Sequence, residues 1–319
     1  MVKQNRINSR SNQKRYGYVS SYASQATRPA RPSALPKRHH SHVGVLFMLL
    51  LIIGLGVHVG LAKHASAHAL ETKKETAAAS AAQAARVQAL GPELNQILNN
   101  NSAVTMSISV AEVDSQASSA ITQYGSDTDF DAASTGKLIT AADYLHHVEN
   151  GSASLSQDID GDSAQDLLQA LIVNSDDGAW LSLNEYLTHD DLAAYASSIG
   201  LSNYSSSDNE LTSNDIALLL QKLYQSRLFN KADTALLLGY MQQANYRDYI
   251  IPAVPAGYTV YHKVGIDDDN VHDAAIIAKG NKAITLVIYT NGNGTYDWAT
   301  RALVMQQITR DVITAYFGS

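Results

Sequence analysis

Ser134 and Lys137 are the residues whose types and spacing most directly suggest chemistry. They lie three positions apart in residues 130–141, which read FDAASTGKLITA and open an apolar-periodic helix. Residues at i and i+3 share one helix face, so the Ser134 hydroxyl and the Lys137 amine can meet. A serine becomes a good nucleophile only when a base takes its proton. A lysine one turn away can be that base if burial or another cation lowers its pKa.

Two further stretches carry residues of the same kind, which matters because single serine–lysine pairs arise by chance, as at Ser11 and Lys14. Residues 171–180 read LIVNSDDGAW and place Ser175 and two carboxylates at a turn between two predicted helices. Residues 261–265 read YHKVG and place a lysine at the end of a strand. The glycine that follows lets another group approach the strand backbone.

In this order the three stretches resemble the S-x-x-K, S-D-N and K-T-G motifs of the penicillin-recognising serine hydrolases, in particular the class A β-lactamase-like group. The likeness also includes LTSNDIALLLQKLY and HKVG followed by HDAAII, and it covers residues 91–319. The resemblance implies an α+β, β-lactamase/DD-peptidase-like fold. Its five-stranded antiparallel sheet would be flanked by N- and C-terminal helices and joined to an all-helical subdomain. No cofactor and no metal are expected.

The resemblance implies a role for each matched residue. Ser134 would be the acylated nucleophile, and Lys137 would take its proton or hold its hydrogen-bond network. Ser175 would relay a proton toward the leaving group, with Lys263 close to it. The backbone N–H groups of Ser134 and Ile266 would form the oxyanion hole. Two lysines in one cleft lower each other's pKa, so one of them can be neutral near pH 7.

Among the expected substrate-binding residues, Asp177, Val264, Gly265 and Ile266, the first two depart from the family pattern. Asp177 stands where the family has Asn, and an ionised carboxylate cannot donate a hydrogen bond to a substrate carbonyl. It can instead pair with Lys137 and keep that lysine charged. Val264 replaces a Thr or Ser whose hydroxyl helps the family to bind a substrate carboxylate.

Glu210 is a weaker candidate for a general base. The interval between Ser175 and Thr212 leaves little room for the long loop that carries the deacylating Glu in class A β-lactamases. Glu210 and Asn214 have an E-x-x-x-N spacing, but they fall at the predicted start of a helix that follows this loop. The favoured interpretation of Glu210 is an acidic residue that interacts with the helix dipole.

For the remaining candidate site residues, a structural role is the favoured interpretation. His262 and His272, expected side by side or opposite each other on neighbouring strands, could hold a metal with Asp273, but cross-strand packing is the favoured interpretation. The run of aspartates at residues 267–269 is interpreted as a solvated turn, and Trp180 as a core residue.

The elements that must position these residues follow from periodicity. Two strands, a run of helices, three strands and a closing helix indicate an α+β domain whose sheet joins distant parts of the chain. Strands are predicted at residues 104–113, 120–124, 258–263, 272–278 and 283–289. Helices are predicted at residues 93–98, 134–148, 162–173, 178–187, 192–198, 212–228, 231–242 and 296–317.

The N-terminal part of the chain predicts export and anchoring. Residues 1–42 contain nine Lys or Arg and no acidic residue, which is typical of a disordered cytoplasmic tail. Residues 43–62 form an apolar run long enough for a transmembrane helix, with the N-terminus inside. Residues 63–90 read as an Ala-rich helical stalk, and residues 91–319 as the catalytic domain. A signal peptide cleaved near Ala69, which would release the domain, is the alternative.

Charge and composition limit the classes of function that the chain can have. The residues after the tail carry a net charge of −16, which argues against a nucleic-acid partner, and the chain has no cysteine. We expect a membrane-anchored, extracytoplasmic serine hydrolase of the D-alanyl-D-alanine peptidase type, acting on cell-wall peptide or a β-lactam-like molecule. The alternatives are a catalytically silent surface binding or scaffold protein of the same fold, and a true class A-like β-lactamase.

Overall fold

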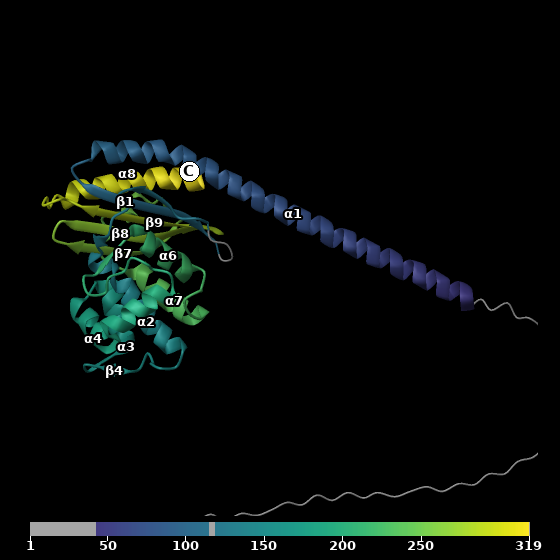
Figure 1. The fold of residues 1–319 in the computed structure, drawn as a ribbon, viewed down its shortest axis with the longest axis horizontal. Helices are drawn as coiled ribbons and strands as arrows, with labels where there is room; N and C mark the ends of the chain where they lie inside the picture. The colour runs from purple at the N-terminus through teal and green to yellow at the C-terminus, as the bar shows by residue number, and fades with distance from the viewer. Residues whose placement is uncertain (1–42, 115–118, 319) are drawn as a thin grey trace, which may run out of the picture. The chain divides into compact units, whose positions relative to one another are not determined.

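A computed structural model describes residues 43–114 and 119–318 (Figure 1). The chain divides after Ala69 into two units, and the second unit, Leu70–Ser319, contains the folded domain. The predicted cytoplasmic tail, residues 1–42, lies outside the described residues.

Among the residues described with their side chains, no helix is both long enough and apolar enough to cross a membrane. The predicted transmembrane segment, residues 43–62, is helical, but its side chains lie outside this described set. The membrane anchor therefore stays a prediction.

The first helix, α1 (Val43–Asn100), contains both the predicted stalk and the short helix predicted after it. The sequence analysis treats the stalk (residues 63–90) and the helix at residues 93–98 as separate helices, but α1 runs through Pro92 without interruption. A proline inside a helix removes one backbone hydrogen bond and crowds the preceding turn. Leu90 and Leu94 are both fully buried on either side of it, and this packing stabilises the helix across the proline.

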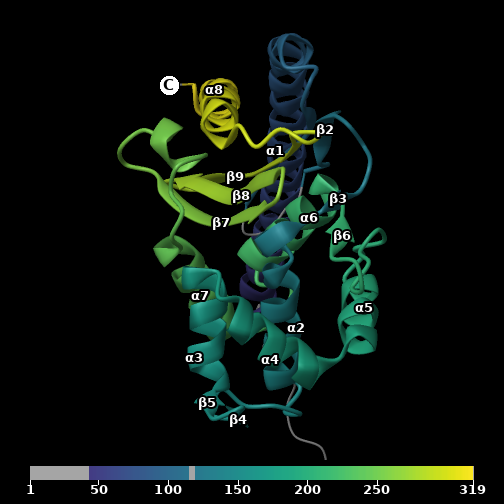
Figure 2. The same cartoon turned by 90° about the vertical axis from the view of Figure 1, so that its left-hand side faces the viewer.

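The predicted five-stranded antiparallel sheet is confirmed, with strand order β2-β1-β9-β8-β7. Strand β1, the first in the chain, pairs along its whole length with β9, the last. The sheet therefore closes around an insertion that holds most of the helices (Figure 2). The strands are β2 (Thr122–Gly125), β1 (Thr105–Val113), β9 (Lys282–Asn291), β8 (Asn270–Lys279) and β7 (Thr259–Asp267).

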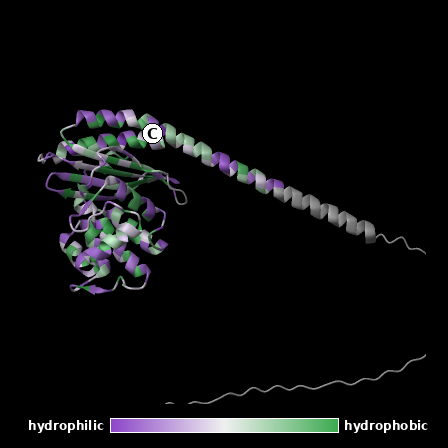
Figure 3. Cartoon of the chain, viewed as in Figure 1, coloured by the Kyte–Doolittle hydropathy of each residue, from purple (hydrophilic) through white to green (hydrophobic). Residues whose placement is uncertain are grey.

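Each face of the sheet packs against helices. One face is covered by the end of α1 and by α8 (Trp298–Phe317), whose hydrophobic and hydrophilic residues alternate along its length (Figures 2 and 3). The other face packs on α6 (Ser213–Tyr224) and on the helical subdomain beyond it. The subdomain helices are α2 (Lys137–Glu149), α3 (Ala164–Gln169), α4 (Asp177–Leu187), α5 (His189–Ser198) and α7 (Lys231–Gln243).

Several short elements have no counterpart in the sequence prediction. Two-residue strands pair as β3 (Phe130–Asp131) with β6 (Glu210–Leu211), and as β4 (Asp158–Ile159) with β5 (Asp162–Ser163). The predicted helix at residues 134–148 begins only at Lys137, after a 3₁₀ turn, η1 (Ala133–Thr135). The helix predicted at residues 162–173 is α3 followed by one π-helical turn, η2 (Ala170–Asn174), and η3 (Ile251–Ala253) precedes β7. Such short segments carry no hydrophobic period that a sequence could reveal.

We predict that Leu94→Ala destabilises the domain by about 3 kcal/mol, because it leaves a cavity between α1 and the sheet. The free energy of unfolding is to be measured by chemical denaturation. The matched control is Glu93→Ala, since Glu93 is the exposed neighbour on the same helix. Equal stability of the two variants would show that this end of α1 contributes nothing to the core.

Candidate active site

Ser134 lies in η1, a turn whose backbone is held in an unusual conformation. Ala133, immediately before it, has φ of +46°, which a residue with a side chain adopts at an energetic cost. The carboxylate of Asp131 accepts a hydrogen bond from the Ala133 N–H at 2.9 Å, and the Asn209 side chain donates to the Ala133 carbonyl at 3.0 Å. These two contacts stabilise the turn that presents Ser134, which is itself half-buried.

Gly265 on β7 lets the sheet edge approach this turn closely, as the sequence predicts. A Cβ atom on Gly265 would lie 2.8 Å from the Ala132 carbonyl oxygen and 3.1 Å from the Thr135 backbone nitrogen. Both neighbours are backbone atoms, so they cannot rotate away. Only glycine therefore permits this contact between β7 and η1.

Lys137 is fully buried and donates hydrogen bonds to three acceptors. Its Nζ atom lies 3.0 Å from Ser134 Oγ, 2.8 Å from the Ser175 carbonyl oxygen, and close to the Asp177 carboxylate. Three acceptors use all three protons of an ammonium group. In this arrangement Lys137 donates to Ser134 and pairs with Asp177, the pairing that the sequence suggests for this lysine.

Ser175 joins this group to Lys263 on β7. Ser175 takes a left-handed conformation, with φ of 59° and ψ of 36°, at the end of η2. Its hydroxyl accepts a hydrogen bond of 2.7 Å from Lys263 Nζ, which also donates to the Val264 carbonyl at 2.8 Å. Ser134, Lys137, Ser175 and Lys263 thus form one connected network, drawn from η1, α2, the turn before α4, and β7.

Lys263 has the lowered pKa that the sequence expects for one of the two lysines. Burial, followed by the positive charge of Lys137, lowers the pKa of Lys263 to about 7. Asp273 and Asp177 act in the opposite direction with smaller effect. A substantial fraction of Lys263 is therefore neutral at pH 7.

Val264 does not present its side chain to the site, and its predicted part in substrate binding stays a prediction. Side chains alternate between the two faces of a strand. Lys263 and Gly265 face η1 and the helical subdomain, whereas Val264 is buried in the core cluster on the other face, and Ile266 packs against that cluster. Near the nucleophile Val264 contributes its carbonyl group, and the role of the Ile266 N–H in an oxyanion hole stays a prediction.

Glu210 lies in β6, not at the start of a helix. It is exposed and sits opposite Asp131 in the β3–β6 pair. The helix α6 begins later, with Thr212 as its N-cap in a capping box with Asp215. Asn214 turns to the sheet, where its side chain accepts a hydrogen bond from Ser109 at 2.7 Å. The structure therefore does not join Glu210 and Asn214 into one group beside Ser134.

His262 and His272 are neither adjacent nor opposite each other, which corrects the expected pairing. His262 lies opposite Ala275 and His272 lies opposite Gly265. In the part of the chain that the structure describes, no group of three or more His, Asp or Glu residues could hold a metal ion. His262 instead forms a buried pair with Asp273, with 3.1 Å between Nδ1 and the carboxylate.

His272 is a positioning residue that sequence reasoning missed. Its Nδ1 accepts a hydrogen bond from the Thr290 N–H at 3.1 Å, so Nε2 carries the proton that it donates to the Asp131 carbonyl at 2.8 Å. Burial lowers the pKa of His272 to about 4, so it is neutral at pH 7. It fixes the segment that leads to Ser134, and no local sequence signal marks this role.

The sequence predicts Trp180 as a core residue, but in the structure it lies beside Lys137 of the candidate site. It is half-buried, its indole N–H donates to Thr140 at 3.0 Å, and its ring lies 5.4 Å from Lys137 Nζ. An aromatic face at this distance stabilises the ammonium form of the lysine. Of the aspartates at residues 267–269, Asp267 ends β7, and Asp268 and Asp269 form the predicted turn that leads to β8.

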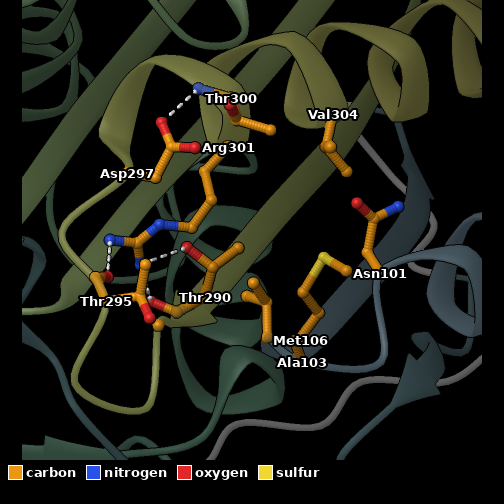
Figure 4. Close-up of a pocket in the computed structure, with 11 residues that line it drawn as sticks. Asn101, Ala103, Met106, Thr290, Thr295, Asp297, Thr300, Arg301 and Val304 are labelled. Carbon is orange, nitrogen blue, oxygen red and sulfur yellow. Dashed lines mark hydrogen bonds between the residues drawn. The ribbon is translucent and has the colours of Figure 1, made fainter.

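A separate cavity of about 120 Å³ lies where α8 begins, lined by Met106, Thr290, Arg301 and Val304 among others (Figure 4). Arg301 is buried there and donates to the carbonyls of Asp269 and Thr295. Its contacts fasten the β7–β8 turn to the start of α8. None of the predicted site residues lines this cavity, so Arg301 has a structural role.

The fold and the Ser134 network together define the β-lactamase class of serine hydrolase folds. The sequence model of the family described as "Beta-lactamase enzyme family" matches residues 89–316. The match covers most of the chain, and the chain belongs to this family. A search of curated protein sequences finds no significant match.

Solved structures of the same fold include penicillin-binding and β-lactamase proteins. PBP-A is 19% identical with a TM-score of 0.65, and the alignment covers 72% of this chain and 96% of PBP-A. An ancestral class A β-lactamase is 22% identical with a TM-score of 0.63, over 71% of this chain and 100% of that one. The β-lactamase from Sphaerobacter thermophilus is 18% identical with a TM-score of 0.62, over 70% and 96%. At sequence identities of 18% to 22%, the likeness to these solved structures establishes the fold alone.

We predict that Gly265→Ala lowers the rate of covalent modification of Ser134 about 100-fold, because the new methyl group displaces η1 and with it the nucleophile. The rate is to be followed by mass spectrometry with an activated acyl donor. The matched control is Gly239→Ala in α7, where an added Cβ has no neighbour within 4 Å. If both variants react at the wild-type rate, the contact between β7 and η1 does not position Ser134.

Proposed function

We propose that the protein is a serine hydrolase that transfers an acyl group through Ser134. One observation carries this proposal: Lys137 Nζ joins Ser134 Oγ to the carbonyl oxygen of Ser175, whose hydroxyl contacts Lys263 Nζ, and Ser134 itself is half-buried. A nucleophile joined to an amine through ordered partners is the arrangement that activates serine in covalent catalysis.

We propose a route for the proton that uses the hydrogen bond between Lys263 and Ser175. The neutral amine of Lys263 takes the proton of the Ser175 hydroxyl, and in the proposed step Ser175 Oγ takes the proton of Ser134 as Ser134 attacks. The C–O bond of the acyl-enzyme forms, the bond to the leaving group breaks, and the leaving group takes a proton from Ser175. Lys137, charged and held by Asp177, stabilises the developing negative charge on Ser134 Oγ. Water then attacks the ester and releases Ser134.

The proposed substrate is a cell-wall peptide or a related amide or ester, in a D-alanyl-D-alanine peptidase-like reaction. The acyl-enzyme complex of a PBP-A variant with penicillin G supports a site of this kind. The proposed location is outside the cell, with residues 43–62 as the membrane anchor and the N-terminus in the cytoplasm. Cleavage near Ala69 would instead release the domain.

Labelling of Ser134 tests the proposal directly. We expect a mass shift of one acyl group when the full-length protein is incubated with a labelled penicillin or an activated ester. The shift should be absent in Ser134→Ala, because the nucleophilic oxygen is missing. A protein that remains folded and takes up no label from any β-lactam or activated ester would contradict the proposal.

Acylation should become faster as the pH rises through 7. With a pKa of about 7 for Lys263, its neutral fraction increases roughly tenfold between pH 6 and pH 8 and then levels off. The rate constant of Ser134 acylation should follow the same curve. It is to be measured by mass spectrometry, with Ser134→Ala as the control for nonspecific labelling. A rate that does not change between pH 6 and pH 8 would exclude Lys263 as the proton acceptor.

A catalytically silent binding or scaffold protein is the second candidate. The ion pair between Lys137 and Asp177 favours it, because it keeps the lysine next to Ser134 charged. The same Ser134→Ala variant separates the two candidates: a scaffold retains its cellular effect without the nucleophile, and an enzyme loses it.

A true β-lactamase is a third candidate with less support. It requires fast deacylation, and the segment between α5 and β6, where a loop with the deacylating base would lie, is short. Steady turnover of penicillin would favour a β-lactamase, and one slow acylation per molecule would exclude it.

A further inference from the structure

Asn209 is the residue just before β6, and it lies against the turn that presents Ser134. Its φ is +55°, a left-handed conformation that asparagine adopts more readily than most residues with a side chain. Its backbone carbonyl accepts a hydrogen bond of 2.8 Å from the Ala132 N–H. This backbone contact fixes Asn209 beside η1 and leaves its side chain to make contacts of its own.

The side-chain amide of Asn209 contacts this turn through its nitrogen. The nitrogen donates to the Ala133 carbonyl at 3.0 Å and to the Asp131 carboxylate at 3.3 Å. The amide oxygen is buried and accepts no hydrogen bond from the described residues. It packs against Gly136, where an added Cβ atom would collide with it. Asn209 therefore acts here as a donor, and one of its acceptors is the carbonyl of the residue before the nucleophile.

The carbonyl that Asn209 holds belongs to the same peptide unit as the N–H of Ser134. A peptide unit is planar, and in its usual trans form the C=O and the N–H point in opposite directions. Two donors on the Ala133 carbonyl, the Asn209 amide and the Gly136 N–H at 3.3 Å, thus determine where the Ser134 N–H points. The φ of +46° at Ala133 costs energy, so the turn keeps this shape only while such contacts hold it.

The Ser134 N–H is the unused donor of this turn. The neighbouring N–H groups of Ala133, Thr135 and Gly136 all have acceptors, whereas that of Ser134 has none among the described residues. A free N–H directly beside the nucleophilic oxygen can stabilise the negative charge that develops when Ser134 Oγ adds to a carbonyl group. Its effect depends on direction, because a donor stabilises an oxyanion only when it points at the place where the charge forms.

We propose that Asn209 is a positioning residue for the oxyanion hole: it holds the Ala133 carbonyl so that the Ser134 N–H is aimed at the carbonyl oxygen of the acyl donor. As Ser134 Oγ bonds to the carbonyl carbon, an electron pair of the C=O bond moves onto that oxygen, where the Ser134 N–H meets the new charge. The C=O bond then re-forms and the bond to the leaving group breaks. The inference rests on acyl transfer by Ser134, and it gives the segment before β6 a task that needs no general base.

A nitrophenyl ester and the matching thionoester, in which sulfur replaces the carbonyl oxygen, test the inference. Sulfur accepts hydrogen bonds weakly, so a thionoester gains little from an oxyanion hole. The variant is Asn209→Gly, because glycine keeps the positive φ without strain while the amide is removed. We expect the maximal acylation rate to fall about 100-fold with the ester and less than about fivefold with the thionoester. The ester concentration at half-maximal rate should change by less than about twofold, because the lost contact acts in the transition state.

Asn293→Gly is the matched control. Asn293 also has a positive φ, of 51°, and its amide also donates to a backbone carbonyl, that of Ala103 at 2.9 Å. Its printed side-chain contacts lie at the start of β1 and not at η1, so both rates should stay at the wild-type value. Rates are to be measured as nitrophenol release by the full-length protein, corrected with Ser134→Ala.

Asn209→Asp adds a readout through pH. A protonated carboxyl group can replace the amide as the donor to the Ala133 carbonyl, whereas an ionised one cannot donate. The neighbouring Asp131 carboxylate raises the pKa of the introduced group and brings its ionisation toward neutral pH. Relative to the wild type at the same pH, the ester rate of this variant should therefore fall about tenfold between about pH 5 and pH 7, and the thionoester rate much less.

The outcomes separate the two proposals. Equal slowing of the ester and the thionoester in Asn209→Gly would show that Asn209 only holds Ser134 in place, and it would overturn the link to the oxyanion hole. Wild-type rates in Asn209→Gly would overturn it as well. If Asn209→Gly does not fold, Asn209→Asp decides, and a ratio to wild type that is independent of pH overturns the inference. Equal nitrophenol release by the wild type and Ser134→Ala would overturn acyl transfer itself, and the inference with it.

Discussion

The buried ammonium group of Lys137 is the contact on which the rest of the site depends. Removing a charged amine from water costs several kcal/mol unless its protons find acceptors. Here the acceptors come from three places in the chain: the η1 hydroxyl, a carbonyl at the end of η2, and a carboxylate at the start of α4. One buried charge thus ties the nucleophile's turn to the helical subdomain and fixes both against α2.

The sequence reveals most of the fold because long elements have clear periods. The strand predicted at residues 104–113 is β1 (Thr105–Val113), and the closing helix differs from α8 by two residues at its start. The three motifs also predict which side chains meet. The alternation of side chains along a strand places Val264 on the face opposite Lys263, because a lysine that points into the site sends the next residue to the other face.

Other features depend on contacts that no local pattern records. The continuation of α1 through Pro92 is due to burial of Leu90 and Leu94 against distant strands. The lowered pKa of Lys263 depends on its burial and on the positive charge of Lys137, which lies far from it in sequence. His272 reaches the segment before Ser134 through a single hydrogen bond to a backbone carbonyl. Short-range sequence spacing contains none of this information.

The pairing of β1 with β9 sets the order in which the molecule can be completed. Strand β9 lies between β1 and β8 in the sheet, yet it is made near the end of the chain, and α8 follows it. Until that segment is available, β1 and β8 each lack their central neighbour and one face of the sheet lacks its covering helix. Contacts between such distant segments form late in folding. A ribosome that makes this chain from its N-terminus therefore handles an unfinished sheet until β9 and α8 have emerged.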